Sequence, residues 1–236
     1  NNEKRFDVVL YINGLPLVFI ELKNATDEKA TVLKAFQQIQ TYKSTVPSIF
    51  YYNALCVISD GIDAKASSVS APFSRYLPWK APKHNESEVK TELQILTEHM
   101  LDRKTLVELI RYCTVFESEE IKDQKTGLIF QTKVKKVAAY HQYYAVQKAV
   151  AQTIRATHSN DGDRKAGVVW HTQGSGKSLS MVFYTGKLVL ALENPTIVVL
   201  TDRNDLDDQL FETFSNCQQL LRQAPQQAED RKHLRT

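Results

Sequence analysis

The sequence lacks long apolar runs and an export signal. No stretch reaches the roughly 18 consecutive apolar residues that a membrane-spanning helix needs. The first residues, Asn1 to Arg5, do not show the charged leader and apolar segment of a secretory signal. We therefore expect no membrane partner and a cytoplasmic protein.

Cysteine and net charge are also scarce. The three cysteines, Cys56, Cys113 and Cys217, are odd in number, far apart and without metal-ligand spacing. This pattern favours free thiols in a reducing compartment over disulfides or zinc. The net charge of +3 is too small to indicate a nucleic-acid partner by itself. No internal repeat is visible, and the glutamine-rich stretch from Gln218 to Gln227 predicts no function.

What remains is ordinary globular sequence. The chain has 236 residues, 42% of them hydrophobic and 24% charged, which is enough for two domains with their own cores. It opens almost directly on a strand pattern and stops within charged, helix-like sequence at Arg235 and Thr236. We expect it to be a piece of a longer protein.

The first part of the chain predicts a hairpin followed by a helix and a strand. Residues 6–12 and 17–22 are rich in β-branched and aromatic residues and flank Asn13-Gly14, a strong hairpin signal. Helical spacing of apolar residues follows over 29–43, then a short apolar strand over 53–59. Residues 67–82 show no period and predict a loop.

The second part predicts connecting helices and then a parallel α/β sheet. Helical patterns cover 86–110, 133–157 and 179–192, and short apolar strands are expected at 167–171 and 196–201. The predicted domains are 1–82, a helical connector over 83–132, and 133–236. Because only two strands are expected in the last domain, we also expect its C-terminal end to be loosely packed.

Acidic and basic side chains gather on the predicted hairpin. Folding about the turn places Asp7 across from Glu21, and Lys23 points to the same face as Glu21 because side chains alternate along a strand. Two carboxylates can hold Mg²⁺ against a phosphate, and an ammonium can orient water or stabilise the transition state. The alternative is an exposed ion pair worth under about 1 kcal/mol.

A glycine-rich loop follows the predicted strand at 167–171. The segment His171-Thr-Gln-Gly-Ser-Gly-Lys-Ser178 leads directly into an apolar helical pattern. Gly174 and Gly176 allow backbone N–H groups to wrap a phosphate, Lys177 reaches the β and γ phosphates, and the Ser178 hydroxyl ligates Mg²⁺. His171 stands where the general P-loop pattern has glycine. The alternative is a glycine-rich turn that happens to precede a helix.

Several of these elements resemble known families. Asp7 with Glu21-Leu22-Lys23 resembles the catalytic motif of the PD-(D/E)xK nuclease superfamily, and Gln38 with Tyr42 is similar to the Gln-x-x-x-Tyr element of its RecB-like branch. Either residue of this last pair, taken alone, is better explained as helix surface, and the neighbouring nuclease motif favours the functional interpretation. That branch normally has a helix before the first strand, which this chain does not show.

The second part resembles superfamily 2 helicase-like motors. Gln142, in Tyr140-His141-Gln142-Tyr143, resembles their adenine-reading glutamine, with a surface glutamine as the alternative. Thr201-Asp202-Arg203 is similar to motif Ia, which tracks the nucleic-acid backbone. Asp202 is not interpreted as the acid that positions the hydrolytic water, so ATP hydrolysis by this chain alone is not expected.

The order of nuclease and motor motifs resembles the restriction subunit of type I restriction-modification systems. The resemblance implies a restriction-endonuclease-like mixed-sheet domain, a helical linker and a partial RecA-like parallel domain. It implies Asp7, Glu21, Lys23, Gln38 and Tyr42 as catalytic residues, and Thr172, Gly174, Ser175, Gly176, Lys177, Ser178 and Gln142 as ATP-binding residues. It also implies Mg²⁺ at Asp7, Glu21 and Ser178.

By the same resemblance the partners are double-stranded DNA and the methyltransferase and specificity subunits, and ATP drives translocation before cleavage. Two other functions remain open. The chain could belong to a helicase-nuclease of DNA repair, which would lack methyltransferase partners. It could also be a nucleotide-binding docking module, in which the hairpin acids bind no metal.

Overall fold

The chain is divided into two compact units. The computed structural model describes residues 4–24, 31–82, 89–122, 127–158, 164–202, 204–230 and 232–235. Unit 1 comprises Asn1–Thr114 and Val134–Tyr140, and unit 2 comprises Val115–Lys133 and His141–Thr236. The two units are built from different elements, so each is described by itself.

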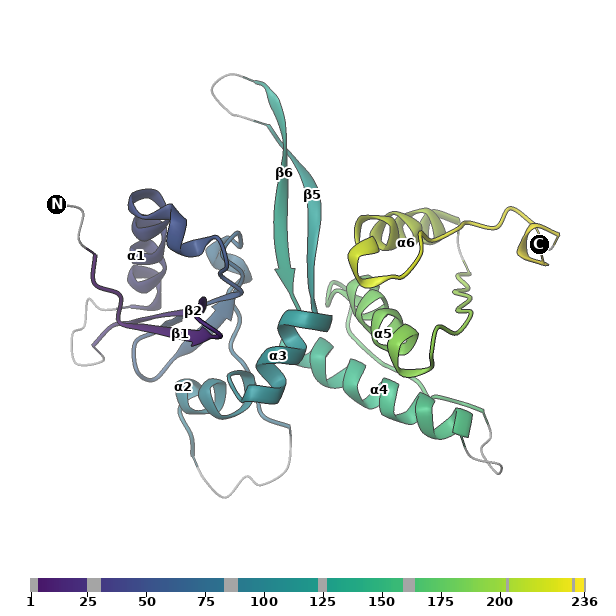
Figure 1. Cartoon of the computed structure of the whole chain (residues 1–236), viewed down its shortest axis with the longest axis horizontal. Coiled ribbons are helices and arrows are strands. Elements are labelled where there is room, and N and C mark those ends of the chain that lie inside the picture. Colours follow the sequence, from purple (N-terminus) through teal and green to yellow (C-terminus); the bar gives the residue numbers. More distant parts are fainter. Residues whose placement is uncertain are drawn as a thin grey trace. The chain divides into compact units, whose positions relative to one another are not determined.

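Unit 1 is built on a four-stranded mixed sheet (Figure 1). Its strands are β1 (Val8–Ile12), β2 (Leu15–Leu22), β3 (Leu55–Ser59) and β4 (Ala64–Ser67), in that order across the sheet. β2 and β3 are parallel, while the outer pairs β1–β2 and β3–β4 are antiparallel. The predicted mixed sheet is therefore confirmed, and the loop expected from residue 67 is preceded by one further strand.

The turn chemistry of Asn13-Gly14 explains the hairpin. Both residues have positive φ, 51° and 79°, as a two-residue type I′ turn requires. The register pairs Val8 with Ile20 and shifts between Leu10 and Tyr11, where the antiparallel ladder is irregular. The predicted hairpin is confirmed.

Helix α1 (Val32–Thr45) packs against β2 and β3. The Thr31 side chain caps its start by accepting a hydrogen bond from the Lys34 N–H. Its buried residues Ala35, Ile39 and Tyr42 join Phe19 and Phe50 in the core of unit 1. β3 is buried along its whole length because it lies inside the sheet and beneath this helix.

Further helices of unit 1 lie between the strands and after them. They are η1 (Pro47–Phe50), η2 (Phe73–Arg75), α2 (Glu92–Ile95), the π-helical turn η3 (Leu96–Met100) and α3 (Arg103–Tyr112). Thr91 and Gln94 form a capping box at α2, and Asp102 caps α3. The connecting helices predicted up to residue 110 are thus confirmed from residue 92, whereas 86–88 lie outside the described residues.

The end of the helical connector and the start of the next helix were predicted wrongly. β5 (Thr114–Lys122) and β6 (Ile129–Val137) pair in a two-stranded sheet, and α4 (Tyr140–His158) begins only at residue 140 (Figure 1). The stretch Thr132-Lys-Val-Lys-Lys-Val137 alternates at period two and is rich in β-branched residues, which favours a strand over a helix.

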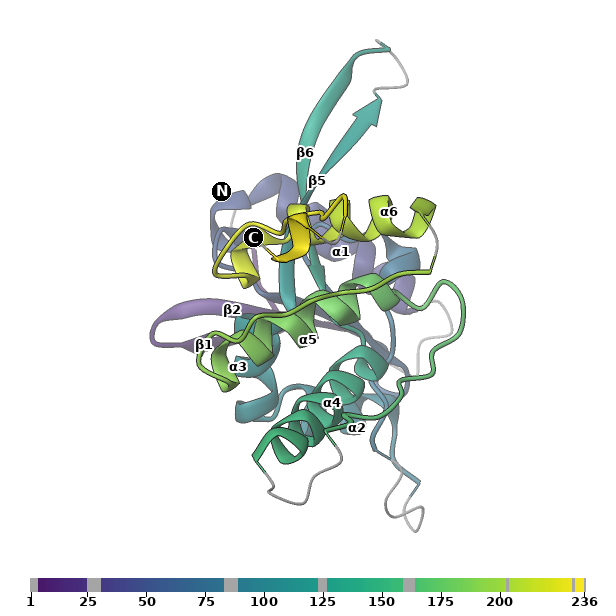
Figure 2. The ribbon, with the colours of Figure 1, turned by 90° about the vertical axis from the view of Figure 1, so that its right-hand side faces the viewer.

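Apart from its share of β5 and β6, unit 2 is helical in the part that the structure describes. Figures 1 and 2 show α5 (Lys177–Ala191) beside α6 (Asn204–Asn216), and the short helices η4 (Gln218–Leu220) and η5 (His233–Arg235) follow. A cavity of about 570 Å³ lined by α5, α6 and residues 221–228 agrees with the expected loose packing of this end. No helix among the described residues is both long and apolar enough to cross a membrane.

The two strands predicted at 167–171 and 196–201 are not formed in the described residues. Parallel strands need neighbours on both edges and cover on both faces, and two strands alone make a marginal sheet. Their apolar side chains instead face solvent, since Val168 and Trp170 are each 90% exposed. Both segments are apolar, as predicted, but an apolar segment becomes a strand only when a neighbouring strand pairs with it.

Candidate functional site

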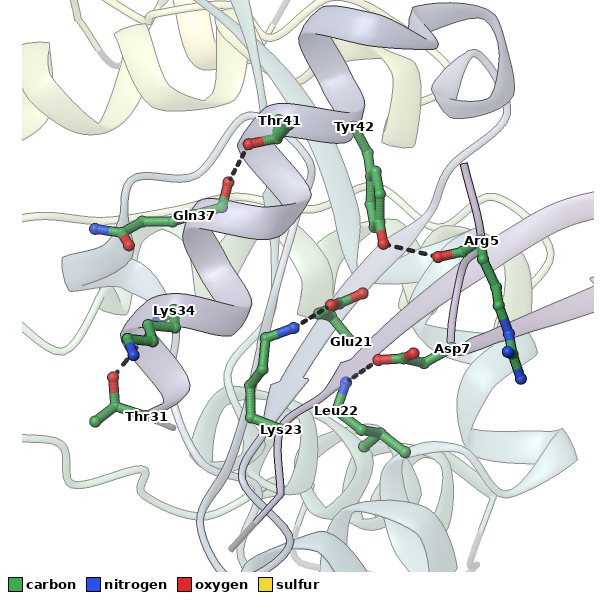
Figure 3. A network of polar contacts seen from close by, with 10 residues as sticks. All are labelled: Arg5, Asp7, Glu21, Leu22, Lys23, Thr31, Lys34, Gln37, Thr41 and Tyr42. Carbon is green, nitrogen blue, oxygen red and sulfur yellow. Dashed lines mark hydrogen bonds and ion pairs between the residues drawn. The ribbon is translucent and has the colours of Figure 1, made fainter. Parts of the chain in front are cut away.

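The hairpin of unit 1 brings Asp7 beside Glu21. Continuing the register one step beyond the Val8–Ile20 pair places Asp7 opposite Glu21. One carboxylate oxygen of Asp7, Oδ2, accepts a hydrogen bond from the Leu22 N–H at 2.8 Å. This bond holds Asp7 at the end of β2, as Figure 3 shows, and the register shift between Leu10 and Tyr11 sets it opposite Glu21.

Glu21 is buried and paired. It is only 3% exposed, and Lys23 Nζ donates to its Oε1 at 2.5 Å. Burial raises the pKa of Glu21 above its usual value, Lys23 opposes the rise, and the nearby charge of Asp7 adds to it. The ion pair is therefore not the exposed surface pair of the alternative interpretation, because one partner is almost fully withdrawn from water.

Helix α1 contributes the remaining predicted residues of this site. The Tyr42 hydroxyl donates to the Arg5 carbonyl oxygen at 2.8 Å (Figure 3). Burial, followed by the charges of Glu21 and Asp7, raises the pKa of Tyr42, while Gln38 one turn earlier lowers it. Asp7, Glu21, Lys23, Gln38 and Tyr42 thus lie together. Arg5 was missed, since a backbone carbonyl contact leaves no trace in side-chain patterns.

The donor set fits a hard divalent cation. Within the part of the chain that the structure describes, no three His, Cys, Asp or Glu side chains gather into a metal-binding cluster. Mg²⁺ needs fewer, because one or two carboxylates and several waters suffice. The raised pKa of Glu21 shows that Lys23 alone does not compensate its buried charge. A cation between the carboxylates of Asp7 and Glu21 would supply that compensation.

The glycine-rich loop of unit 2 has the predicted backbone. Gly174 and Gly176 have positive φ of 78° and 76°, and α5 begins at Lys177. The Ser175 N–H and hydroxyl both bond the Thr172 carbonyl oxygen, which closes the loop. The loop therefore meets the N-terminus of a helix, where unpaired N–H groups and the helix dipole attract anions.

Lys177 and Ser178 stand at the first turn of α5. Lys177 Nζ lies 3.0 Å from the Thr172 carbonyl oxygen and 3.4 Å from that of His171, so its ammonium is folded across the loop. Neutral carbonyl oxygens bind an ammonium less strongly than the charged oxygens of a phosphate do, so a phosphate would be a better partner for Lys177. Ser178 is half-buried next to it.

The start of α4 also contacts this loop. Gln142 Nε2 donates to the Gly176 carbonyl oxygen at 2.9 Å, and His141 Nε2 lies 3.1 Å from that of Ser175. His141 was missed as a site residue, although it is the direct neighbour of Gln142. Its ring also packs edge-on against that of His171, with centroids 5.3 Å apart.

His171 occupies the first position of the loop. Burial, then the positive charges of His141 and Lys177, lowers the pKa of His171. Its Nδ1 is buried and has no hydrogen-bond partner among the described residues. Further along, Thr201 bonds the Asp207 carboxylate at 3.3 Å, whereas Arg203 of the proposed motif Ia lies outside the described residues.

Comparisons with known proteins agree with this division of the chain. Residues 1–75 match the family described as type I restriction enzyme R protein N terminus, and residues 141–236 match the SWI2/SNF2 ATPase family. The chain is 50% identical, over 97% of its length, to the type I restriction enzyme HindI endonuclease subunit of Haemophilus influenzae. It is 32% identical, over 90% of its length, to a putative type I restriction enzyme MjaIXP endonuclease subunit of Methanocaldococcus jannaschii.

The matches define the class of protein as one that joins a restriction-enzyme N-terminal region to an ATPase region. The chain belongs to the family of type I restriction enzyme R subunits. It spans 21% of the length of each of these two relatives.

Proposed function

We propose that this chain carries the nuclease centre and the first nucleotide-binding segment of an ATP-dependent restriction endonuclease that acts on double-stranded DNA. The observation that carries the proposal is the grouping of Asp7, buried Glu21 and Lys23 at one end of the hairpin, under Tyr42 of α1. Both relatives named above are called endonuclease subunits, which supports the same activity.

In the proposed mechanism the side chains have separate tasks. Asp7 and Glu21 hold Mg²⁺, which when bound polarises the phosphodiester and activates water. Lys23, already 2.5 Å from Glu21, orients the attacking water or stabilises the charge that develops on the phosphate. Tyr42 and Gln38 support the carboxylates from α1. We also propose that unit 1 has the PD-(D/E)xK nuclease fold.

Unit 2 supplies the start of the motor in this proposal. Thr172 to Ser178 hold the phosphates of ATP at the N-terminus of α5, and Ser178 ligates the Mg²⁺ that accompanies ATP. The unit is the first part of a RecA-like domain in this proposal. The enzyme works in the cytoplasm, joined to methyltransferase and specificity subunits, and translocates DNA before it cuts.

The repair helicase-nuclease and the docking module remain the alternatives. Copurification with methyltransferase and specificity subunits supports restriction, whereas their absence favours repair. A docking module needs no buried carboxylate, and it binds no divalent cation on the hairpin. The burial of Glu21 favours an enzyme over such a module.

The test uses the full-length complex with Glu21→Ala. We expect it to lose Mg²⁺-dependent cleavage of duplex DNA while ATP hydrolysis, followed in the same tubes, continues. Glu98→Ala is the matched control, because it breaks another lysine–glutamate pair, Lys90–Glu98 at 2.7 Å, on the surface. Retained cleavage by Glu21→Ala contradicts the nuclease assignment and leaves only the motor.

A further inference from the structure

Helix α4 reaches the glycine-rich loop through two consecutive residues. His141 Nε2 contacts the carbonyl oxygen of Ser175 at 3.1 Å, and Gln142 Nε2 donates to that of Gly176 at 2.9 Å. A carbonyl oxygen only accepts hydrogen bonds, so His141 must carry its proton on Nε2 to make this contact. Two adjacent peptide groups of the loop are thus held from the same side.

Holding a carbonyl also orients the next N–H group. The peptide unit is planar and trans, so its C=O and N–H point in opposite directions. When α4 holds the carbonyl of Ser175, the Gly176 N–H points away from α4. The carbonyl of Gly176 does the same for the Lys177 N–H. These are N–H groups that a glycine-rich loop offers to phosphate at a helix N-terminus.

The fit around Gly176 is close. Its carbonyl oxygen accepts from Gln142 and also from the Ser180 N–H and hydroxyl, at 3.0 Å and 3.2 Å. A Cβ atom on Gly176 would lie 2.6 Å from Gln142 Nε2, which is too close for a real contact. Gln142 is only 6% exposed, so its amide is packed into the loop. The Gln142 side-chain amide therefore points to the backbone of the loop.

We propose that His141 and Gln142 are positioning residues that hold the peptides of Ser175 and Gly176 so that the loop binds phosphate before nucleotide arrives. The proposal rests on the nucleotide-binding function given to this loop above. It differs from base reading by Gln142, because a preformed loop improves the binding of any triphosphate by the same factor, whereas a base contact favours ATP alone.

The test measures three ligands on the full-length R subunit. MgATP, MgGTP and magnesium tripolyphosphate, which has no base, compete against a fluorescent ATP analogue. We expect Gln142→Ala and His141→Ala each to weaken all three by a common factor of about five to ten, as loss of one hydrogen bond implies. The preference for ATP over GTP should stay unchanged.

Matched variants separate positioning from general damage. Gln147→Ala removes another glutamine hydrogen bond of the same helix, one that Gln147 Oε1 accepts from Lys187 Nζ at 2.9 Å away from the loop, and should leave all three affinities unchanged. His141→Gln keeps a side-chain N–H donor and should restore most of the lost affinity. If Gln142→Ala fails to fold, the comparison of His141→Ala with His141→Gln decides alone.

Each outcome has a clear meaning. Loss of ATP affinity with unchanged tripolyphosphate affinity makes Gln142 a base reader and overturns the proposal, as does unchanged binding of all three ligands. The Lys177→Ala variant tests separately whether this loop is the nucleotide site. If that variant binds MgATP as the wild type does, the loop is not the nucleotide site, whatever the variants at 141 and 142 show.

Discussion

Replacing Glu21 by glutamine should stabilise unit 1 at neutral pH while destroying the proposed metal site. Burial raises the pKa of Glu21, so the folded chain holds this proton more tightly than the unfolded chain does. The stability of unit 1 then falls as the pH rises from about 4.5 through the folded-state pKa, and stays at the lower value above it. Glu21→Gln has no such proton and should not show the fall.

The size of the effect follows from two opposing terms. The bond from Lys23 to Glu21 is charge-assisted, worth about 1.5–3 kcal/mol, and a bond to a neutral amide is worth about 1 kcal/mol, so the change loses about 0.5–2 kcal/mol. Removing the buried charge and its repulsion from Asp7 must gain more than that, because the pKa of Glu21 is raised despite Lys23. We therefore expect Glu21→Gln to be the more stable of the two chains at neutral pH.

Tryptophan emission gives an assay confined to unit 1. Trp79 of unit 1 is 3% exposed, whereas Trp170 of unit 2 is 90% exposed and changes its surroundings little on unfolding. Urea unfolding of this chain at pH 4, 6 and 8 without divalent ions should give equal stabilities at pH 4 and a more stable Glu21→Gln at pH 8. Mg²⁺ at ten times its Kd should add about 1.4 kcal/mol to the wild type only.

The reasoning is refuted if Glu21→Gln is less stable than the wild type at pH 8, or if the difference does not change with pH. Either result means that Lys23 fully compensates the buried carboxylate. If Mg²⁺ stabilises the wild type and Glu21→Gln equally, the explanation of the Glu21 pKa still holds, but Mg²⁺ does not bind at Glu21.

Three further predictions test other parts of the structure. Asp7→Asn keeps an oxygen that accepts the Leu22 N–H and removes the repulsion from Glu21, so the melting temperature should not fall, while Mg²⁺-dependent cleavage falls by more than the roughly 10- to 100-fold cost of losing an outer-shell partner. Gly174→Ala and Gly176→Ala both place a side chain at positive φ, at a cost of about 1–2 kcal/mol, but only Gly176→Ala also meets Gln142, so calorimetric titration with MgATP should show the larger loss there. The lowered pKa of His171 means that the unfolded chain takes this proton first, so the stability of unit 2 should fall as the pH drops below about 6.5, and His171→Gln should flatten that slope in thermal melts.

Local chemistry made the acidic site predictable. The Asn13-Gly14 turn predicts the hairpin and brings Asp7 near Glu21, but the turn alone would pair Asp7 with Ile20. The ladder irregularity between Leu10 and Tyr11 shifts the register by one residue, and this shift sets Asp7 opposite Glu21. The burial of Glu21 could not be read from the hairpin, since it depends on α1 and β3, which arrive from elsewhere in the sequence.

Non-local pairing explains the errors. The segments at 167–171 and 196–201 have the apolar composition of parallel strands, but such strands form only when neighbours complete their hydrogen bonds. The β5–β6 hairpin was missed for the opposite reason. The lysines of β6, at 133, 135 and 136, look like a charged helix face, yet Thr132 and Val134 alternate with Lys133 and Lys135 at the period of a strand.

The phosphate loop shows how a motif can be correct while its main contact is unforeseen. Its glycines, lysine and serine were predicted from their spacing, and their backbone has the expected form. The contacts that hold this form come from residues 34 positions earlier, at the start of α4. A change in α4 should therefore alter phosphate binding even though it touches no phosphate, and the variants at His141 and Gln142 measure that effect directly.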